Sequence, residues 1–333
     1  FTVGMSLPAV FGTDVPKGNY ADLTTKGFEL SVSWRDQFQL ASKPFNYEVR
    51  FTLADYQSTI DKYNNPEKKL GDDYYYEGMK VGEIWGYETE GFFTSQADID
   101  SHAKQPYFYA GATAGQWLPG DIKFKDLNGD GVIDYGNNTV DNPGDQKIIG
   151  NSEPRFIYGI NLSGDWNNFF VSAFFQGVGK QDWWPGSEAS YFWGMYNRPY
   201  NDMPKSHLGN IWTEENPNTY FPRLRGYSSE EPYAELNLKQ TRYLQNIAYI
   251  RMKNIQLGYT LPKSFISKLR MQNAKVYVSG ENLWSWSPFY KYSKDLDVEA
   301  VRGSDRDLTE GTSGNGYSYP ILKSVSFGLS VTF

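Results

Sequence analysis

The sequence predicts an all-β protein, part of a transmembrane antiparallel β-barrel with long extracellular loops. Three observations lead to this prediction. The carboxy-terminal strand alternates apolar and small polar residues, the connections between strands alternate between short and long, and 333 residues include 26 Tyr, 21 Phe and 10 Trp. Each of these features is typical of barrel strands that have lipid on one face and water on the other.

The terminal strand, residues 323–333, shows the alternation most clearly. Its apolar residues fall on one face, because successive side chains of a strand point to opposite sides. Serine, glycine and threonine occupy the other face, and the apolar set is Val325, Phe327, Leu329, Val331 and Phe333. In a membrane barrel the apolar face meets lipid, whereas in a soluble sandwich it meets a second sheet. This strand alone leaves both interpretations open.

Alternation at period two predicts further strands along the chain. The expected pairs are 27–40 with 45–57, 156–165 with 169–178, and 247–261 with 273–284. The stub Phe1-Thr-Val-Gly-Met-Ser-Leu7 resembles the end of a strand that began upstream, so about eight strands are expected. It also suggests that the chain is the carboxy-terminal fragment of a longer protein, without its signal peptide.

The connections between these strands alternate in length. Those expected to be long are roughly 58–155, 180–246 and 285–320, whereas the intervening ones are short. In bacterial outer-membrane barrels, short turns face the periplasm and long loops face outside. The pattern therefore predicts a barrel, unless a long segment such as 80–94 contributes an odd number of membrane strands. Trp34, Trp166, Trp284 and Trp286 suit aromatic girdles near the strand ends, or packing beneath a loop.

Composition excludes several other classes of protein. No segment approaches the ~20 apolar residues of a spanning helix, and the net charge of -7 argues against nucleic-acid binding. The chain has no cysteine and only two histidines, His102 and His207, without metal-ligand spacing. It lacks a phosphate loop and a nucleophile elbow, so no enzymatic activity is expected.

One loop segment resembles the first two-thirds of an EF-hand calcium loop. Oxygen ligands recur at short intervals with glycines between them, and the candidate ligands are Asp126, Asn128, Asp130, Val132 and Asp134. The twelfth position is Asn137 rather than glutamate, although Asp141 or Asp145 could supply an oxygen. The alternatives are a calcium site that stiffens a loop and a metal-free turn held by Asx hydrogen bonds.

A second segment, 182–196, concentrates large aromatic residues in an expected outer loop. Such rings can stack on sugars, anchor a protein partner or pack against one another, and all three possibilities stay open. The candidate contact residues are Trp183, Trp184, Tyr191, Phe192, Trp193 and Tyr196. Arg223, Arg225, Arg242 and Arg251 are candidates for contacts with an acidic substrate or with another domain. Arg251 and Lys253 share the polar side of a strand, where lumen-facing salt bridges are expected.

Seven motifs, in order along nearly the whole chain, resemble the SusC/RagA family of TonB-dependent outer-membrane transporters. They are 25–30 (TKGFEL), 84–93 (IWGYETEGFF), 120–134 (GDIKFKDLNGDGVID), 149–155 (IGNSEPR), 212–217 (WTEENP), 249–262 (YIRMKNIQLGYTLP) and 279–283 (SGENL).

The resemblance implies that residues 1–333 form the carboxy-terminal third of a 22-stranded barrel in the outer membrane of a Gram-negative cell. The plug domain and the TonB contact would lie outside this chain. It further implies uptake of oligosaccharides, or alternatively oligopeptides, with a SusD-like surface lipoprotein as partner and without a required cofactor. A passive porin or adhesin barrel and a soluble carbohydrate-binding sandwich are the competing interpretations.

Overall fold

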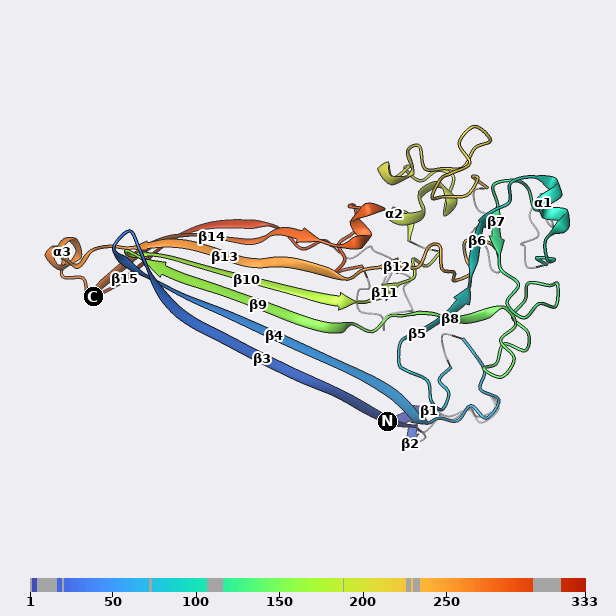
Figure 1. The fold of residues 1–333 in the computed structure, drawn as a ribbon, viewed down its shortest axis with the longest axis horizontal. Helices are drawn as coiled ribbons and strands as arrows, with labels where there is room; N and C mark the ends of the chain where they lie inside the picture. Colours follow the sequence, from blue (N-terminus) through green and yellow to red (C-terminus); the bar gives the residue numbers. More distant parts are fainter. Residues whose placement is uncertain are drawn as a thin grey trace.

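The computed structural model describes residues 2–4, 17–19, 21–71, 74–106, 116–187, 189–225, 229, 234–301 and 319–333. Its main feature is one antiparallel sheet of seven strands (Figure 1). In spatial order these are β15 (Ser324–Thr332), β14 (Asn273–Trp286), β13 (Tyr249–Thr260), β10 (Phe169–Lys180), β9 (Arg155–Trp166), β4 (Lys43–Lys62) and β3 (Asp22–Leu40). All six strands of the three predicted hairpins, and the terminal strand, belong to this sheet.

The sheet has one strand fewer than the eight that the sequence predicts. In the described part of the amino-terminal stub, β1 (Thr2–Gly4) pairs with β2 (Lys17–Asn19) in a separate two-stranded sheet. Phe1 and residues 5–7 of the stub lie outside the described residues. Residues 2–4 therefore do not contribute an eighth strand to the main sheet.

The short connections lie together at one end of the sheet, which we call the turn end (Figure 1). Ala41 and Ser42 join β3 to β4 with φ of 47° and 61°, and Asn167 and Asn168 join β9 to β10 with φ of 49° and 69°. Two consecutive positive φ values give a turn whose twist matches that of a hairpin, and asparagine adopts them readily. The connection from β13 to β14 contains the short helical segments α3 (Lys263–Ile266) and η5 (Ser267–Leu269).

The strand register produces two chemically different faces. Val32 lies opposite Phe51, which in turn lies opposite Ile160, so apolar side chains form continuous rows across the strands. On the other face, Arg35 pairs with Glu48 across β3 and β4, with 2.9 Å between Nε and Oε2. We call these the apolar face and the polar face. A shift of one residue in register would mix them, which is why the alternation in the sequence specifies the pairing.

The apolar face is not covered by any described part of the chain. Trp34 is 62% exposed and Phe327 is 86% exposed, and further large apolar side chains of β3, β14 and β15 are exposed, together with Leu257 of β13. A row of large exposed apolar side chains of this extent marks a surface that contacts lipid or another protein. The buried residues lie elsewhere, so the sheet is not one half of a soluble sandwich formed within the described residues.

The long connections form a separate body at the opposite end, the loop end (Figure 1). It contains the small sheets β5 (Glu83–Tyr87) with β8 (Gln146–Asn151), β6 (Thr89–Phe92) with β7 (Ile122–Phe124), and β11 (Asp182–Trp183) with β12 (Gln245–Asn246). Its helical segments are α1 (Gln96–Ser101), α2 (Ser190–Trp193), η2 (Gly194–Tyr196), η3 (Lys205–His207) and η6 (Pro288–Lys291). Segment 80–94 belongs to this body and adds no strand to the main sheet, so the predicted alternation of connections is confirmed. None of the described helices is long and apolar enough to cross a membrane.

Candidate functional site

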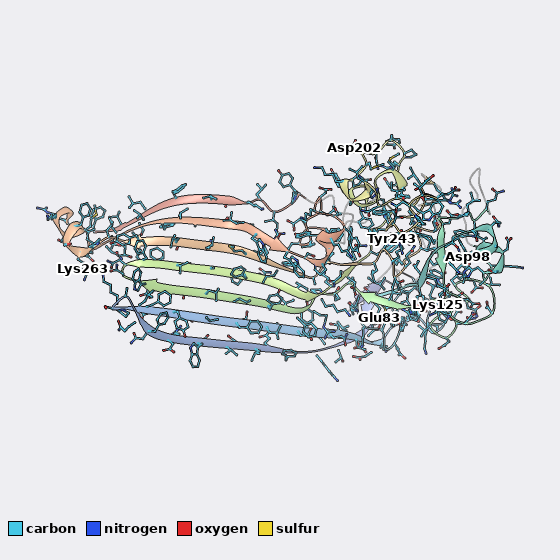
Figure 2. All side chains as sticks on the ribbon, turned by 45° about the horizontal axis from the view of Figure 1, so that its top comes forward. Glu83, Asp98, Lys125, Asp202, Tyr243 and Lys263 are labelled. Carbon is cyan, nitrogen blue, oxygen red and sulfur yellow. The ribbon has the colours of Figure 1, made fainter. Side chains whose placement is uncertain are left out.

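The loop body is held together by a buried aromatic cluster, here called the loop core. Its fully buried side chains include Phe192, Trp193, Tyr196, Phe221, Tyr243 and Phe289. The rings of Phe192 and Trp193 meet edge to face with centroids 4.8 Å apart, and those of Trp193 and Tyr243 with centroids 5.2 Å apart. Such pairs contribute stability beyond the area that they bury. Tyr243 marks this region in Figure 2.

The six aromatic residues singled out from the sequence do not share one environment. Trp183, Phe192, Trp193 and Tyr196 are buried in the loop core, which is the self-packing alternative that the sequence left open. The Trp193 Nε1 atom donates to the carbonyl of Gly186 over 3.0 Å. Trp184 is half-buried against the core, and Tyr191 is 54% exposed. Only these last two of the six offer appreciable surface to a substrate or a partner in this structure.

A buried cluster of charges joins two of the long loops. Asp121, directly before β7, is fully buried and accepts hydrogen bonds from the Nε atoms of Arg223 and Arg225, over 2.6 and 2.7 Å. Glu235 is also fully buried and accepts from the backbone amide of Ile122 over 2.8 Å. Burial, and then the charge of Asp121, raise the pKa of Glu235 to about 8. The two arginines are therefore engaged within the loop body, although the sequence suggested contact with an acidic substrate.

The calcium-like segment is stabilised by hydrogen bonds from its own backbone amides to its side-chain oxygens. Asp126 accepts from the amides of Gly129 and Gly131, over 2.6 and 2.9 Å, and Asp134 Oδ1 accepts from Gly136 over 2.7 Å. Asn128 Oδ1 accepts from the Asp130 amide, and Asp130 Oδ1 accepts from the Val132 amide. These are the Asx hydrogen bonds of the metal-free alternative. Among the residues that the structure describes, no group of three or more His, Cys, Asp or Glu side chains is arranged to hold a metal, and calcium binding stays a prediction.

Asp145 completes this turn from outside the motif. Its carboxylate is buried and accepts from the amides of Leu127 and Asp134, over 2.7 and 2.8 Å. Burial raises the pKa of Asp145, and the hydrogen bonds from Asp134 and Leu127 partly oppose that rise. The sequence indicated Asp145 as a substitute oxygen ligand. In the structure its carboxylate accepts hydrogen bonds from backbone amides instead.

An ion network ties the third long loop to the polar face of the sheet. Arg251 on β13 lies opposite Gln176, in a polar row, and donates to both carboxylate oxygens of Asp297, over 3.1 and 2.5 Å. Its Nε atom lies 2.7 Å from Glu299 Oε1, and Lys253 pairs with the other oxygen of Glu299. Burial acts to raise the pKa of Asp297, but the hydrogen bond from Arg251 and the Glu299 amide outweigh it, so the pKa is lowered. The predicted salt bridges of Arg251 and Lys253 are thus confirmed.

Sequence reasoning missed the carboxylates that complete these networks. Asp297 and Glu299 lie 46 residues from their cationic partners. The only signal was indirect, because cations on the polar side of a strand require anions nearby. The histidines take structural positions: the buried His207 Nε2 lies 2.8 Å from the carbonyl oxygen of Phe192, and the His102 ring packs edge-on against Phe93.

Comparisons with known proteins agree on one group of relatives. No protein-family model matches the chain. TonB-dependent receptors P3 and P26 of Formosa agariphila are each 26% identical to it, over 98% and 99% of this chain and 30% and 31% of their own lengths. The chain therefore spans about a third of these curated relatives.

Solved structures support the same fold. The structure of the RagAB peptide transporter matches 100% of this chain and 32% of its own, with a TM-score of 0.67 and 17% identity. The RagAB importer in its 'closed-closed' state matches with a TM-score of 0.64. Together, these relatives confirm the predicted barrel-strand fold and the outer-membrane location. The chain is similar over its full length to SusC/RagA-like TonB-dependent transporters, as its motifs predict.

Proposed function

We propose that this chain forms the carboxy-terminal part of the barrel of an outer-membrane importer that takes up oligosaccharides, energised through TonB. The observation that carries the proposal is the division of the molecule into three surfaces. An uncovered apolar face suits lipid, a polar face with Arg35, Glu48 and Arg251 suits a lumen, and a folded loop body lies at one end. A passive porin needs no such loop body, which is why transport of a large substrate is the better account.

The loop body suits a partner that closes over the barrel. It has its own core and two buried ion clusters, so it can present a rigid surface to a partner rather than a set of flexible loops. We propose that a SusD-like surface lipoprotein binds there as a lid. Tyr191, which is 54% exposed, and the half-buried Trp184 are the proposed contacts, with either the lid or the substrate.

An oligopeptide is the second candidate substrate. It is favoured by the RagAB peptide transporter, whose fold this chain shares along its whole length. The relatives bear transporter and receptor names, which supports a transport role rather than an enzymatic one. Calcium, if bound at Asp126–Asp134, would stiffen a loop rather than take part in transport.

Uptake by cells tests the proposal. Cells that express the full-length protein with its lipoprotein partner are given labelled oligosaccharides or labelled oligopeptides, with and without TonB. We expect TonB-dependent accumulation of an oligosaccharide. Accumulation of peptides alone would select the second candidate, and uptake that persists without TonB would favour a passive pore. Tyr191→Ala should weaken lid or substrate binding, whereas Tyr319→Ala, at an exposed tyrosine in the third long connection, should not.

A further inference from the structure

A cavity in the loop body has the lining of a small-molecule site. Its volume is about 360 Å³, near the lower end of the ~300–1,000 Å³ typical of ligand pockets. Three stretches that are distant in sequence converge on it: the segment before β5 together with β5 itself, the loop that follows the calcium-like motif, and residues 237–239. Glu83, at the start of β5, lies in this part of the molecule (Figure 2).

Aromatic rings form much of the wall. Tyr74 and Tyr135 are 46% and 36% exposed, so their rings are accessible at the mouth of the cavity, whereas Tyr76 is buried deeper. Tyr76 donates its hydroxyl to Glu83 Oε2 over 2.5 Å, and the Trp85 Nε1 atom donates to the Tyr76 hydroxyl over 3.3 Å. This chain of hydrogen bonds fixes the inner rings, so the cavity is preorganised rather than collapsible.

Amide groups supply the polar part of the lining. Gln146 donates to Asn138 Oδ1 over 3.3 Å, and Asn138 donates to the carbonyl of Leu70 over 2.9 Å, so both side chains have fixed positions. Among the lining residues that the structure describes, Glu83 is the only carboxylate and Lys239 the only cation. A lining with balanced charge and without clustered cations does not suit a phosphate or another polyanion.

Backbone hydrogen-bonding groups of β5 are already paired with other parts of the chain. β5 pairs with β8 along one edge, and on the other side the Tyr87 amide donates to the carbonyl of Lys239 over 2.8 Å. The Thr241 amide in turn donates to the Tyr87 carbonyl over 3.0 Å. A peptide bound as an added strand needs an open edge, which β5 does not offer at this position. The ligand must therefore be recognised by side chains.

We propose that this cavity binds one or two units of a neutral saccharide. Sugar rings have apolar C–H faces that stack on aromatic rings and hydroxyls that bond amides, and the cavity supplies both kinds of group. Tyr74 stacks on the sugar at the mouth, while Asn138, Gln146 and Glu83 bond its hydroxyls. The site lies outside the 182–196 segment to which the sequence pointed. This inference rests on the proposed function, because it names a saccharide subsite on an oligosaccharide importer.

Binding to the purified full-length protein in detergent, measured by calorimetry, tests the site. The probes are maltohexaose, laminarihexaose and a short inulin, with tri-alanine as the peptide probe. Tyr74→Ala should weaken the affinity for a bound saccharide about tenfold, equivalent to about 1.4 kcal/mol. Tyr74→Phe should keep the affinity, because it keeps the ring. Tyr200→Ala, at a tyrosine that is 75% exposed elsewhere in the loop body, is the matched control and should have no effect.

The outcomes separate this site from the import function. Saccharide binding that is equal in wild type and Tyr74→Ala overturns the subsite but leaves import untouched. Binding of tri-alanine alone, weakened by Tyr74→Ala, overturns the choice of saccharide, as does the absence of binding by all three saccharides at millimolar concentration. TonB-dependent uptake, measured in parallel in cells, reports on the proposed function independently of either result.

Discussion

Replacement of Arg251 by methionine should release the third long loop from the polar face of the sheet. The guanidinium bonds both oxygens of Asp297 and contacts Glu299, whereas the other partners of these carboxylates are two backbone amides at Asp297 and Lys253 at Glu299. Methionine keeps much of the side-chain length but removes the charge. Among the described residues, two buried carboxylates then remain with Lys253 as their cationic partner.

The free-energy cost of Arg251→Met depends on how deeply the ion network is buried. The side chains of Arg251, Asp297 and Glu299 are 4%, 8% and 12% exposed, so solvent screens their interaction only weakly. Removal of one partner from a buried pair costs about 3–5 kcal/mol, because the remaining charge is left uncompensated. Since 1.4 kcal/mol is tenfold in an equilibrium, the local opening of residues 295–301 should become at least about a hundredfold more frequent.

Hydrogen exchange of the full-length protein in detergent measures this opening directly. The amides of Glu299 and Ile321 donate to Asp297, over 3.0 and 3.1 Å, and report on the network. Arg50→Met is the matched control, because Arg50 belongs to the same polar face but is exposed. If peptides covering 295–301 exchange equally in wild type and Arg251→Met, the ion network does not fasten the loop and the reasoning is refuted.

Three further predictions concern the loop core, the buried charges and the lipid-facing surface. Trp193→Ala should destabilise the loop body by about 3–5 kcal/mol, seen as faster proteolysis of 190–225, whereas equal protection of these residues would contradict a shared core. The raised pKa of Glu235 means that the folded loop body favours the neutral carboxyl, so wild-type loop stability should fall as pH rises from the unfolded pKa of ~4.3 to the folded pKa of about 8. Glu235→Gln should not show this fall, because its side chain does not titrate. The same dependence of proteolysis on pH in wild type and variant would refute this. Leu329→Arg should cost about 2–4 kcal/mol in urea unfolding from lipid vesicles, whereas Ser330→Arg on the polar face should cost far less, and equal costs would contradict the assignment of faces.

The strands were predictable because one face of each is mainly apolar, which produces a regular alternation of apolar and polar residues in the sequence. Val32 and Phe51 lie on the apolar face that alternation indicates, and pairing across strands leaves little choice of register. The strand ends were less predictable. β3 begins at Asp22 rather than near residue 27, because Thr24 and Thr25 continue the hydrogen-bonded ladder without lipid-facing apolar side chains.

The loop body was only partly predictable, because its contacts join distant segments. The aromatic content of 182–196 was visible, but its burial depends on Phe221, Tyr243 and Phe289, which come from three later stretches. Tyr74 and Asn138 likewise line one cavity although 64 positions separate them. Local periodicity contains no information about such pairings, whereas the short-range Asx pattern at Asp126 correctly indicated a turn.

Chemical labelling of intact cells tests the central claim, that the sheet crosses the outer membrane with its loop body outside. The chain has no cysteine, so single cysteines can be introduced without interference. Tyr200→Cys reports on the loop body and Ser264→Cys on α3 at the turn end. A membrane-impermeant maleimide should label Tyr200→Cys in intact cells and Ser264→Cys only after the outer membrane is permeabilised. Labelling of Ser264→Cys in intact cells at the same rate as Tyr200→Cys would contradict the account.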